Sequence, residues 1–174
     1  MARKKLLLHV CCGPCATWAI EFLLSSYDLT LFFSNSNIFP LQEYKKRLQY
    51  AKHLADIHNL ALIEDDYNHN LWLNFIHPFE LEPEGGKRCD KCFEFNLGRA
   101  SAYALQHGYD YFTTTLTISP YKDTQKIFAV GNKFKNYLAI DFKQEDGYKK
   151  SIQLSKKHCL YRQKYCGCEF SIRK

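Results

Sequence analysis

Seven of the eight cysteines fall into three short groups, and grouped thiols are the residues of this chain best suited to bind a metal. The groups are Cys11, Cys12 and Cys15; Cys89 and Cys92; and Cys166 and Cys168. Thiolates are the usual ligands of structural zinc and of iron–sulfur clusters. Each group alone is weak evidence, but together they indicate a metal site. We predict that all seven cysteines converge on one pocket.

Seven thiols exceed the need of a single metal centre. A structural zinc site takes four ligands, and a cubane iron–sulfur cluster takes about four thiolates. The surplus fits two adjacent metal sites, or one site with a redox-active thiol pair. Zinc with three spare cysteines is an alternative. Another is a thioredoxin-like centre at Cys12-Gly13-Pro14-Cys15, which would leave the other groups unexplained. The eighth cysteine, Cys159, stands alone and is left out of the predicted site.

The elements around the first group predict how it is positioned. Residues 6–10 are mostly apolar and predict a short buried strand, and residues 16–24 predict a helix. Open α/β sheets place their ligands on such strand-to-helix loops, and a helix N-terminus favours thiolates. The second group opens a helix predicted over residues 92–107. The third group has to be brought to the same end of the sheet by the C-terminal segment.

Strand and helix patterns alternate along the remaining chain. Further strands are predicted at residues 28–33, 60–63, 109–115 and 137–141, and further helices at residues 41–58, 72–79, 124–134 and 152–158. This alternation predicts an α/β fold with a parallel sheet of four or five strands flanked by helices. No repeat or linker divides the chain, so residues 1–174 are expected to form one domain with a basic, cysteine-containing C-terminal segment.

Composition sets the expected compartment and partner. No apolar run is long enough to span a membrane and no signal peptide is evident, so we expect a cytoplasmic protein with reduced thiols and no membrane partner. Charge is uneven. Residues 131–174 carry 11 Lys or Arg against 4 Asp or Glu, whereas residues 56–94 carry 3 against 9. A basic end on an acidic body suits a polyanionic partner, although a solvated lysine-rich surface is the alternative.

Five motifs in order along nearly the whole chain resemble the epoxyqueuosine reductases of the QueH type. They are Leu8-His9-Val10-Cys11-Cys12-Gly13-Pro14-Cys15; Asn35-Ser36-Asn37-Ile38-Phe39-Pro40 with Glu43-Tyr44 and Arg47; Glu84-Gly85-Gly86-Lys87-Arg88-Cys89 with Cys92; Thr113-Thr114-Thr115-Leu116 with Ser119-Pro120; and Tyr161-Arg162-Gln163-Lys164-Tyr165-Cys166-Gly167-Cys168. The last is the most distinctive. One departure is Ser36, where the family commonly has proline, and we expect it to be tolerated.

The resemblance implies a fold and a reaction. The fold is Rossmann-like, similar to that of the adenine nucleotide alpha hydrolases, with the first cysteine group on the loop where those proteins hold phosphate. The reaction is the last step of queuosine synthesis, in which the epoxide oxygen of epoxyqueuosine at the wobble position of tRNA is removed reductively. The resemblance also implies a [4Fe-4S] cluster and a second mononuclear metal, expected to be iron. No side chain can supply the electrons, so an external one-electron donor is needed.

Site residues follow from these motifs. Cofactor ligands are expected among Cys11, Cys12, Cys89, Cys92, Cys166 and Cys168, with Cys15 added for the metals as a whole. A carboxylate ligand is also implied, for which Asp141 and Asp90 are candidates. Candidate proton donors are Tyr121, Tyr161 and Tyr165, although a tyrosine in such a place is more often a packing or base-stacking residue. Arg88, Arg162 and Lys164 flank the thiols and are expected to contact RNA phosphates or to balance cluster charge.

Two other functions remain open at this point. A cluster-dependent tRNA thiolase would use a similar fold, but the Ser-Gly-Gly-x-Asp-Ser type of ATP loop is replaced here by Cys11-Cys12-Gly13-Pro14. A zinc-stapled RNA-binding module would need no redox chemistry. Zinc protein is colourless and iron–sulfur protein is brown, so colour separates this last alternative from the other two.

Overall fold

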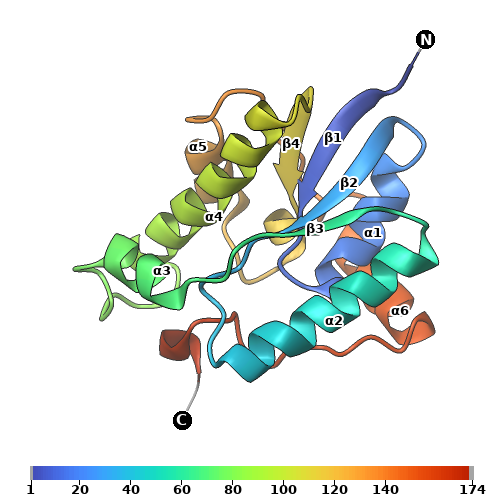
Figure 1. Cartoon of the computed structure of the whole chain (residues 1–174). Coiled ribbons are helices and arrows are strands. Elements are labelled where there is room, and N and C mark those ends of the chain that lie inside the picture. Colours follow the sequence, from blue (N-terminus) through green and yellow to red (C-terminus); the bar gives the residue numbers. More distant parts are fainter. Residues whose placement is uncertain (1, 173–174) are drawn as a thin grey trace.

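The computed structural model describes residues 2–172 and is built around a parallel sheet of four strands (Figure 1). The strands are β1 (Lys4–His9), β2 (Tyr27–Phe33), β3 (Leu62–Glu64) and β4 (Tyr111–Thr114), in the order β3-β2-β1-β4. β1 lies in the middle, where Leu6 is in register with Leu29 of β2 and Tyr111 of β4. This order and direction confirm the predicted α/β, Rossmann-like class.

Alternating residues of β1 face two separate cores. Leu6 and Leu8 belong to the core under one layer of helices, whereas Leu7 belongs to the core under the other layer. All three are fully buried. A strand covered on both faces is apolar along most of its length, which is why residues 6–10 are apolar apart from His9, whose ring nitrogens are hydrogen-bonded to Thr114 and Ser34.

Helices cover both faces of the sheet (Figure 1). One layer contains α1 (Gly13–Leu23), α2 (Leu41–Ile57) and α6 (Gly147–Lys157), and the other contains α3 (His69–Ile76), α4 (Lys87–Gln106) and α5 (Thr124–Gly131). Two short 3₁₀ helices, η1 (Thr115–Ile118) and η2 (Glu169–Ser171), complete the elements. Among these helices, none combines the length and apolar character needed to cross a membrane.

The predicted fifth strand at residues 137–141 is wrong. Within the described residues this segment makes a single isolated bridge, between Phe112 and Tyr137. The reason lies in β4, which ends at Thr114 and turns into η1. Side chains then replace the backbone ladder: the Thr113 hydroxyl donates to the Leu138 carbonyl at 2.7 Å, and the Thr117 hydroxyl donates to the Ile140 carbonyl at 2.8 Å.

Several helix ends also differ from the predictions. α4 begins at Lys87, so the Cys89–Cys92 pair lies in its first two turns and not before the helix. α6 begins at Gly147, five residues earlier than expected, and α5 ends at Gly131. α3 ends at Ile76, before Pro78, a residue that cannot donate a backbone hydrogen bond.

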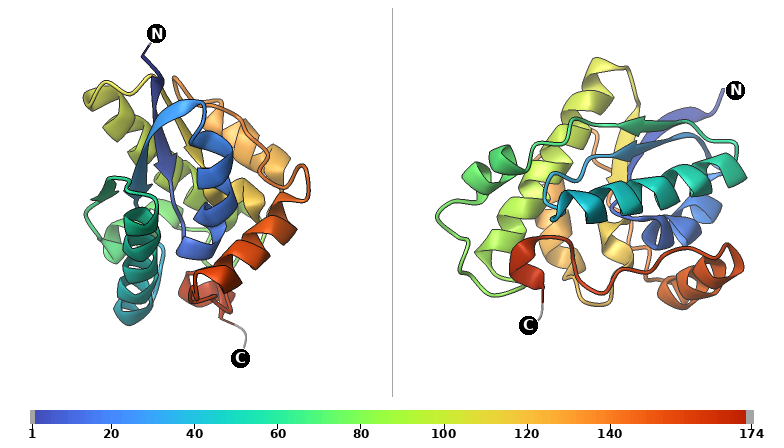
Figure 2. Two further views of the ribbon diagram at one scale, coloured as in Figure 1. Left: turned by 90° about the vertical axis from the view of Figure 1, so that its right-hand side faces the viewer. Right: turned by 60° about the horizontal axis from the view of Figure 1, so that its bottom comes forward.

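After α6 the chain crosses the molecule to the start of α4. Figures 1 and 2 show this C-terminal segment running from α6, past the first turn of α2, to the neighbourhood of α3. The Phe39 amide donates to the Gly167 carbonyl at 2.9 Å, and η2 packs its Phe170 against Trp72 of α3. The segment therefore joins the two helical layers below the sheet.

The start of α6 leaves no room for a side chain. A Cβ atom on Gly147 would lie 1.8 Å from the Phe142 carbonyl oxygen and 2.8 Å from the Trp18 ring. A Cβ on Gly98, inside α4, would make an ordinary contact with the Phe134 ring at 3.4 Å. These two glycines form a matched pair.

We predict opposite effects for the same substitution at the two positions. Gly147→Ala should lower the free energy of unfolding by about 3 kcal/mol, because backbone must move to relieve the overlap. Gly98→Ala should raise it by roughly 0.5–1 kcal/mol, because alanine costs less entropy in a helix interior. Urea unfolding followed by circular dichroism measures both. A Gly147→Ala variant as stable as the parent would contradict the close packing of α6 on α1.

Candidate metal centre

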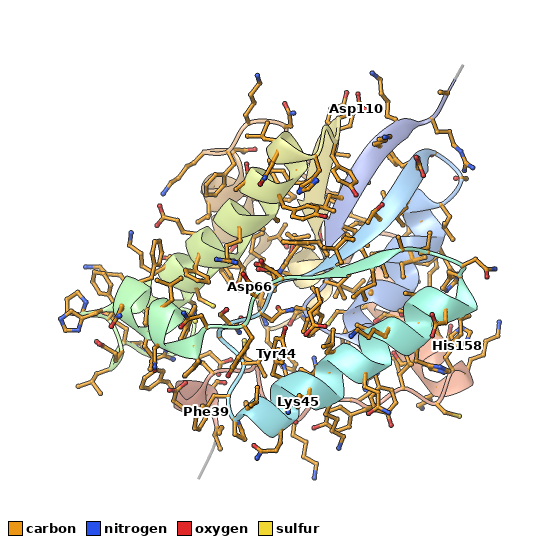
Figure 3. All side chains as sticks on the ribbon, in the orientation of Figure 1. Phe39, Tyr44, Lys45, Asp66, Asp110 and His158 are labelled. Carbon is orange, nitrogen blue, oxygen red and sulfur yellow. The ribbon has the colours of Figure 1, made fainter. Side chains whose placement is uncertain are left out.

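The C-terminal ends of three neighbouring strands meet at one edge of the sheet. There β1 leads to Cys11, β2 leads to Asn35 and β4 leads to Thr115. Figure 3 labels Phe39 at this end of the molecule and Asp110 at the opposite end. Crevices at this edge are where open α/β sheets bind ligands.

The first cysteine group forms a tight triad. The Sγ atoms of Cys11, Cys12 and Cys15 all lie within 4.8 Å of one another, so the three thiols could bind one metal ion. Local structure fixes them: Cys12 is the N-cap of α1, and its Sγ accepts a hydrogen bond from the Cys15 amide at 3.4 Å. The Thr115 hydroxyl donates to the Cys11 Sγ at 3.4 Å.

Hydrogen bonding and burial within the triad favour a single ionised thiol, that of Cys11. Hydrogen bonds from Cys12 and Cys15 hold the pKa of Cys11 well below its usual range, and the Lys122 ammonium acts in the same direction. Burial raises the pKa of Cys12 to about 12, and the pKa of Cys15 is also raised, by its hydrogen bonds to the other two sulfurs. The Gln163 amide nitrogen donates to the Cys12 Sγ at 3.0 Å, which adds a neutral donor to the triad.

The other four grouped cysteines line a small cavity together. These are Cys89 and Cys92 from α4, and Cys166 and Cys168 from the C-terminal segment. We call them the quartet. Since α4 is a regular helix here, Cys89 and Cys92 are three residues apart and share one face of it. Gly167 between the other two has a φ of 154° and lies against Asn37 and Arg47, so a side chain there would be strained and crowded.

Burial and the charge of a neighbouring thiolate raise the pKa values of three cysteines of the quartet. Burial is the largest cause for Cys89, Cys92 and Cys168, and the charge of Cys166 adds to it in all three. The Trp72 indole N–H opposes the shift at Cys92 by stabilising its thiolate. Clustered thiols that repel one another when ionised are the donors that a bound cation stabilises.

Lys122 lies between the triad and the quartet. Burial lowers its pKa, but the thiolates of Cys166, Cys11 and Cys15 outweigh burial and raise it. Lys122 lines the small cavity and also a second, larger one. The larger cavity measures about 640 Å³, within the range of small-molecule sites, and has cysteines from all three groups in its wall: Cys11, Cys15, Cys92 and Cys166.

Arg47 of α2 holds the C-terminal segment in place. It is 2% exposed. Its Nη1 donates to the Cys166 carbonyl at 2.8 Å, its Nη2 donates to the Tyr165 carbonyl at 3.1 Å, and its Nε pairs with Glu43 at 2.7 Å. One planar guanidinium thus fixes the backbone on which half of the quartet is carried.

The turn after β2 forms another wall of the larger cavity. The Asn35 Nδ2 donates to the Val10 carbonyl at 2.8 Å, and the Asn37 Oδ1 accepts from the Asn96 Nδ2 at 3.1 Å. The Ser36 Oγ accepts a hydrogen bond from the Asn68 backbone amide at 3.0 Å. Its side chain therefore ties this turn to the segment between β3 and α3.

The three predicted tyrosine donors lie in different settings. The Tyr161 hydroxyl donates to the Glu43 carboxylate at 3.1 Å, and the Tyr165 hydroxyl donates to the Phe39 carbonyl. Tyr121 is 83% exposed and stands at the rim of the larger cavity. Tyr161 and Tyr165 thus have their protons engaged inside the protein, whereas the Tyr121 ring faces solvent beside the cavity.

The three basic residues predicted to contact RNA also lie in different settings. Arg88 is buried, donates to the carbonyls of Glu80 and Glu82, and lies 5.2 Å from the Phe170 ring centroid. It fixes the loop that leads into α4. Arg162 and Lys164 are exposed and line the larger cavity. Both therefore lie where a bound polyanion could be reached from solvent.

The two candidate carboxylates lie elsewhere. Asp141 accepts from the Lys143 amide at 3.0 Å, and Asp90 faces Lys126 at 3.6 Å. Within residues 2–172 the walls of the two cavities include neither of them; the acidic residue common to both walls is Glu84. Cys159 is exposed and, in the same described range, is part of neither wall.

Sequence reasoning assigned no role to Lys122, Gln163, Arg47 or Trp72. Arg47 and Gln163 stand inside the quoted motifs and Lys122 follows Ser119-Pro120 by two residues, so nearness to the motifs was the available signal. Trp72 lies outside all five motifs. The sequence pattern could not show that these side chains lie near cysteine sulfurs or bind the backbone carbonyls of the segment that carries Cys166 and Cys168.

We predict that the C-terminal segment depends on the Arg47 guanidinium. Arg47→Met should lower the free energy of unfolding by about 3 kcal/mol, because it leaves Glu43 and two carbonyls without their buried partner. It should also weaken metal retention, measured as metal per chain after chelator treatment. Lys45→Met makes a similar chemical change at an exposed position of the same helix (Figure 3) and should be neutral. Equal stability of the two variants would contradict this role.

Comparison with known proteins identifies the family. The sequence model of "Epoxyqueuosine reductase QueH" matches residues 6–174. The chain is 37% identical to the epoxyqueuosine reductase QueH of Streptococcus pyogenes serotype M1, over 98% of this chain and 71% of that protein. It is 38% identical to the one from Staphylococcus aureus, over 97% and 76%, and 33% identical to the one from Thermotoga maritima, over 95% and 89%. With its cysteines gathered at the ligand-binding edge of a Rossmann-like sheet, this chain belongs to the epoxyqueuosine reductase QueH family.

Proposed function

We propose that this protein is an oxidoreductase that acts on tRNA carrying epoxyqueuosine at the wobble position and removes the epoxide oxygen to give queuosine. Family membership supports the reaction. The observation that carries the proposal is the larger cavity, because thiols of all three cysteine groups, a lysine and two exposed basic residues share its wall. No specific observation favours the thiolase or the zinc module.

The reaction sets what the site must supply. Opening the epoxide and forming the alkene consumes two electrons and two protons, and the oxygen leaves as water. Amino-acid side chains do not provide the electrons, so a bound redox group and an external one-electron donor are required. We expect the protein to work in the cytoplasm, where thiols remain reduced.

The donor sets support two metal centres. The quartet of Cys89, Cys92, Cys166 and Cys168 fits the four thiolates of a [4Fe-4S] cluster. The triad of Cys11, Cys12 and Cys15 fits a mononuclear metal, expected to be iron, with a coordination position left for another ligand. When bound, such a cluster supplies electrons one at a time.

The side chains of the protein prepare the cavity for the substrate. Lys122 carries a positive charge between the two cysteine groups and offsets the negative charge of their thiolates. Its Nζ also holds protons beside the space that the substrate oxygen would enter. Arg162 and Lys164 at the rim are suited to phosphates next to the modified nucleotide. The basic α6 is suited to more distant phosphates.

We predict that the quartet is essential for the reaction. Cys89→Ser and Cys166→Ser should abolish reduction, because a hydroxyl is a poor ligand for cluster iron. Cys159→Ser is the matched control and should retain most of the activity, because that thiol is exposed and outside both groups. The assay combines reconstituted protein, dithionite and tRNA carrying epoxyqueuosine without oxygen, followed by mass spectrometry of the digested nucleosides for loss of one oxygen.

The same assay separates the other functions. A thiolase would add sulfur to the nucleoside, and a zinc module would leave it unchanged. If protein with a full complement of iron and sulfide binds this tRNA and never removes the oxygen, the proposed function is wrong.

Tyr121 gives a second prediction, which separates stacking from proton donation. We propose that its exposed ring stacks on a nucleobase at the cavity rim. Tyr121→Phe should then keep the affinity for tRNA, whereas Tyr121→Ala should weaken it by about 1–3 kcal/mol, the usual worth of one stacked base. Binding titrations at fixed salt measure this. Loss of turnover in Tyr121→Phe with unchanged affinity would instead support the hydroxyl as the proton donor.

A further inference from the structure

The Trp72 indole N–H is a buried polar group without an ordinary partner. Trp72 is 0% exposed, and its Nε1 makes no hydrogen bond to any oxygen, nitrogen or sulfur of the described residues. Leaving a buried donor unpaired costs about 1–3 kcal/mol, so such groups in proteins usually have an explanation. The ring is held firmly: His69 stacks on it with centroids 5.4 Å apart, and Phe170 lies on it at 6.4 Å.

The cavity beside the indole is lined by cysteine side chains. Trp72 lines the small cavity together with all four cysteines of the quartet. It packs in one apolar cluster with Cys168, Cys92 and Phe95. One N–H group reaches Cys92 in this cluster: the Asn96 side-chain amide nitrogen lies 3.8 Å from its Sγ. A thiolate sulfur is a weak but real acceptor, and the N–H of indole is a donor only.

We propose that, when the quartet holds its cluster, Trp72 donates an N–H···S hydrogen bond to the Cys92 thiolate and thereby tunes the reduction potential of that cluster. This inference rests on the cluster site proposed above. Hydrogen bonds to cluster sulfurs are among the factors that set the potential of iron–sulfur proteins. Reduction adds negative charge to the cluster and its ligands, so a donor at the sulfur stabilises the reduced state more and raises the midpoint potential. Trp72 is a positioning residue in this role, since it acts through Cys92.

The test compares the two tryptophans of the chain. Trp72→Phe removes the N–H and keeps an aromatic ring, whereas Trp18→Phe makes the same change in α1, where the ring lies 4.0 Å from Lys150 Nζ and lines neither cavity in the described residues. Both variants are reconstituted with iron and sulfide. The midpoint potential is measured by anaerobic redox titration of the visible absorption, and the Fe–S(Cys) stretching modes are measured by resonance Raman spectroscopy.

The expected result is a midpoint shifted to more negative potential in Trp72→Phe, with iron and sulfide per chain unchanged, and a midpoint equal to the parent's in Trp18→Phe. The Fe–S(Cys) modes should shift to higher frequency in Trp72→Phe alone, because a sulfur relieved of its hydrogen bond binds iron more strongly. An unchanged midpoint in fully loaded Trp72→Phe overturns the inference.

A second replacement keeps the test decisive if phenylalanine leaves a void. Benzothienylalanine at position 72 has the size and shape of tryptophan but carries sulfur in place of N–H, and it should give the same negative shift. A parent-like midpoint in that protein overturns the inference even if Trp72→Phe fails to load. Parent protein that binds no iron–sulfur cluster overturns the proposed cluster site as well, so the two failures are distinguishable.

Discussion

The contact between Arg47 and the carbonyls of Tyr165 and Cys166 is the interaction on which the site depends most. Without it, the C-terminal segment would have only the Phe39–Gly167 hydrogen bond and side-chain contacts to hold it against α2. The quartet requires that segment, because two of its four thiols come from it. A long, flexible lysine could not replace the planar fork that reaches both carbonyls and Glu43 together. The position of Cys166 and Cys168 is thus set by a buried guanidinium that binds the backbone of their segment, and not by the cysteine side chains themselves.

The cysteine groups come from opposite layers of the fold. The triad stands at the start of α1, which covers one face of the sheet, and Cys89 and Cys92 stand at the start of α4, which covers the other. The carboxyl edge of the sheet is where the two layers approach each other. Lys122 fills the interval and lines both cavities together with cysteines of the triad and of the quartet. A single lysine therefore couples the electrostatics of two groups that the sheet keeps apart.

Much of this arrangement could be predicted from the sequence, and the rest could not for physical reasons. Largely apolar runs at residues 6–10 and 28–33 predicted two of the buried parallel strands, because burial on both faces favours apolar residues at successive positions. The run at residues 137–141 looked similar, but after one bridge to Phe112 its carbonyls accept from threonine hydroxyls, because β4 ends at Thr114. The cysteine spacings indicated a metal site, yet their division into a triad and a quartet depends on tertiary contacts. The burial of Arg88 and the exposure of Tyr121 likewise follow from the packing of distant loops.

The quartet also has a consequence for unfolding. Cys92 and Cys166 are 74 positions apart in the chain, and β4, η1, α5 and α6 all lie between them. A cluster bonded to both would close this long stretch into a loop, as a disulfide does, and would remove much of the entropy that the unfolded chain gains. Loss of the cluster to oxygen would open that loop. Oxidative damage to the cofactor would then lower the stability of the folded chain, starting with the segment that carries Cys166 and Cys168.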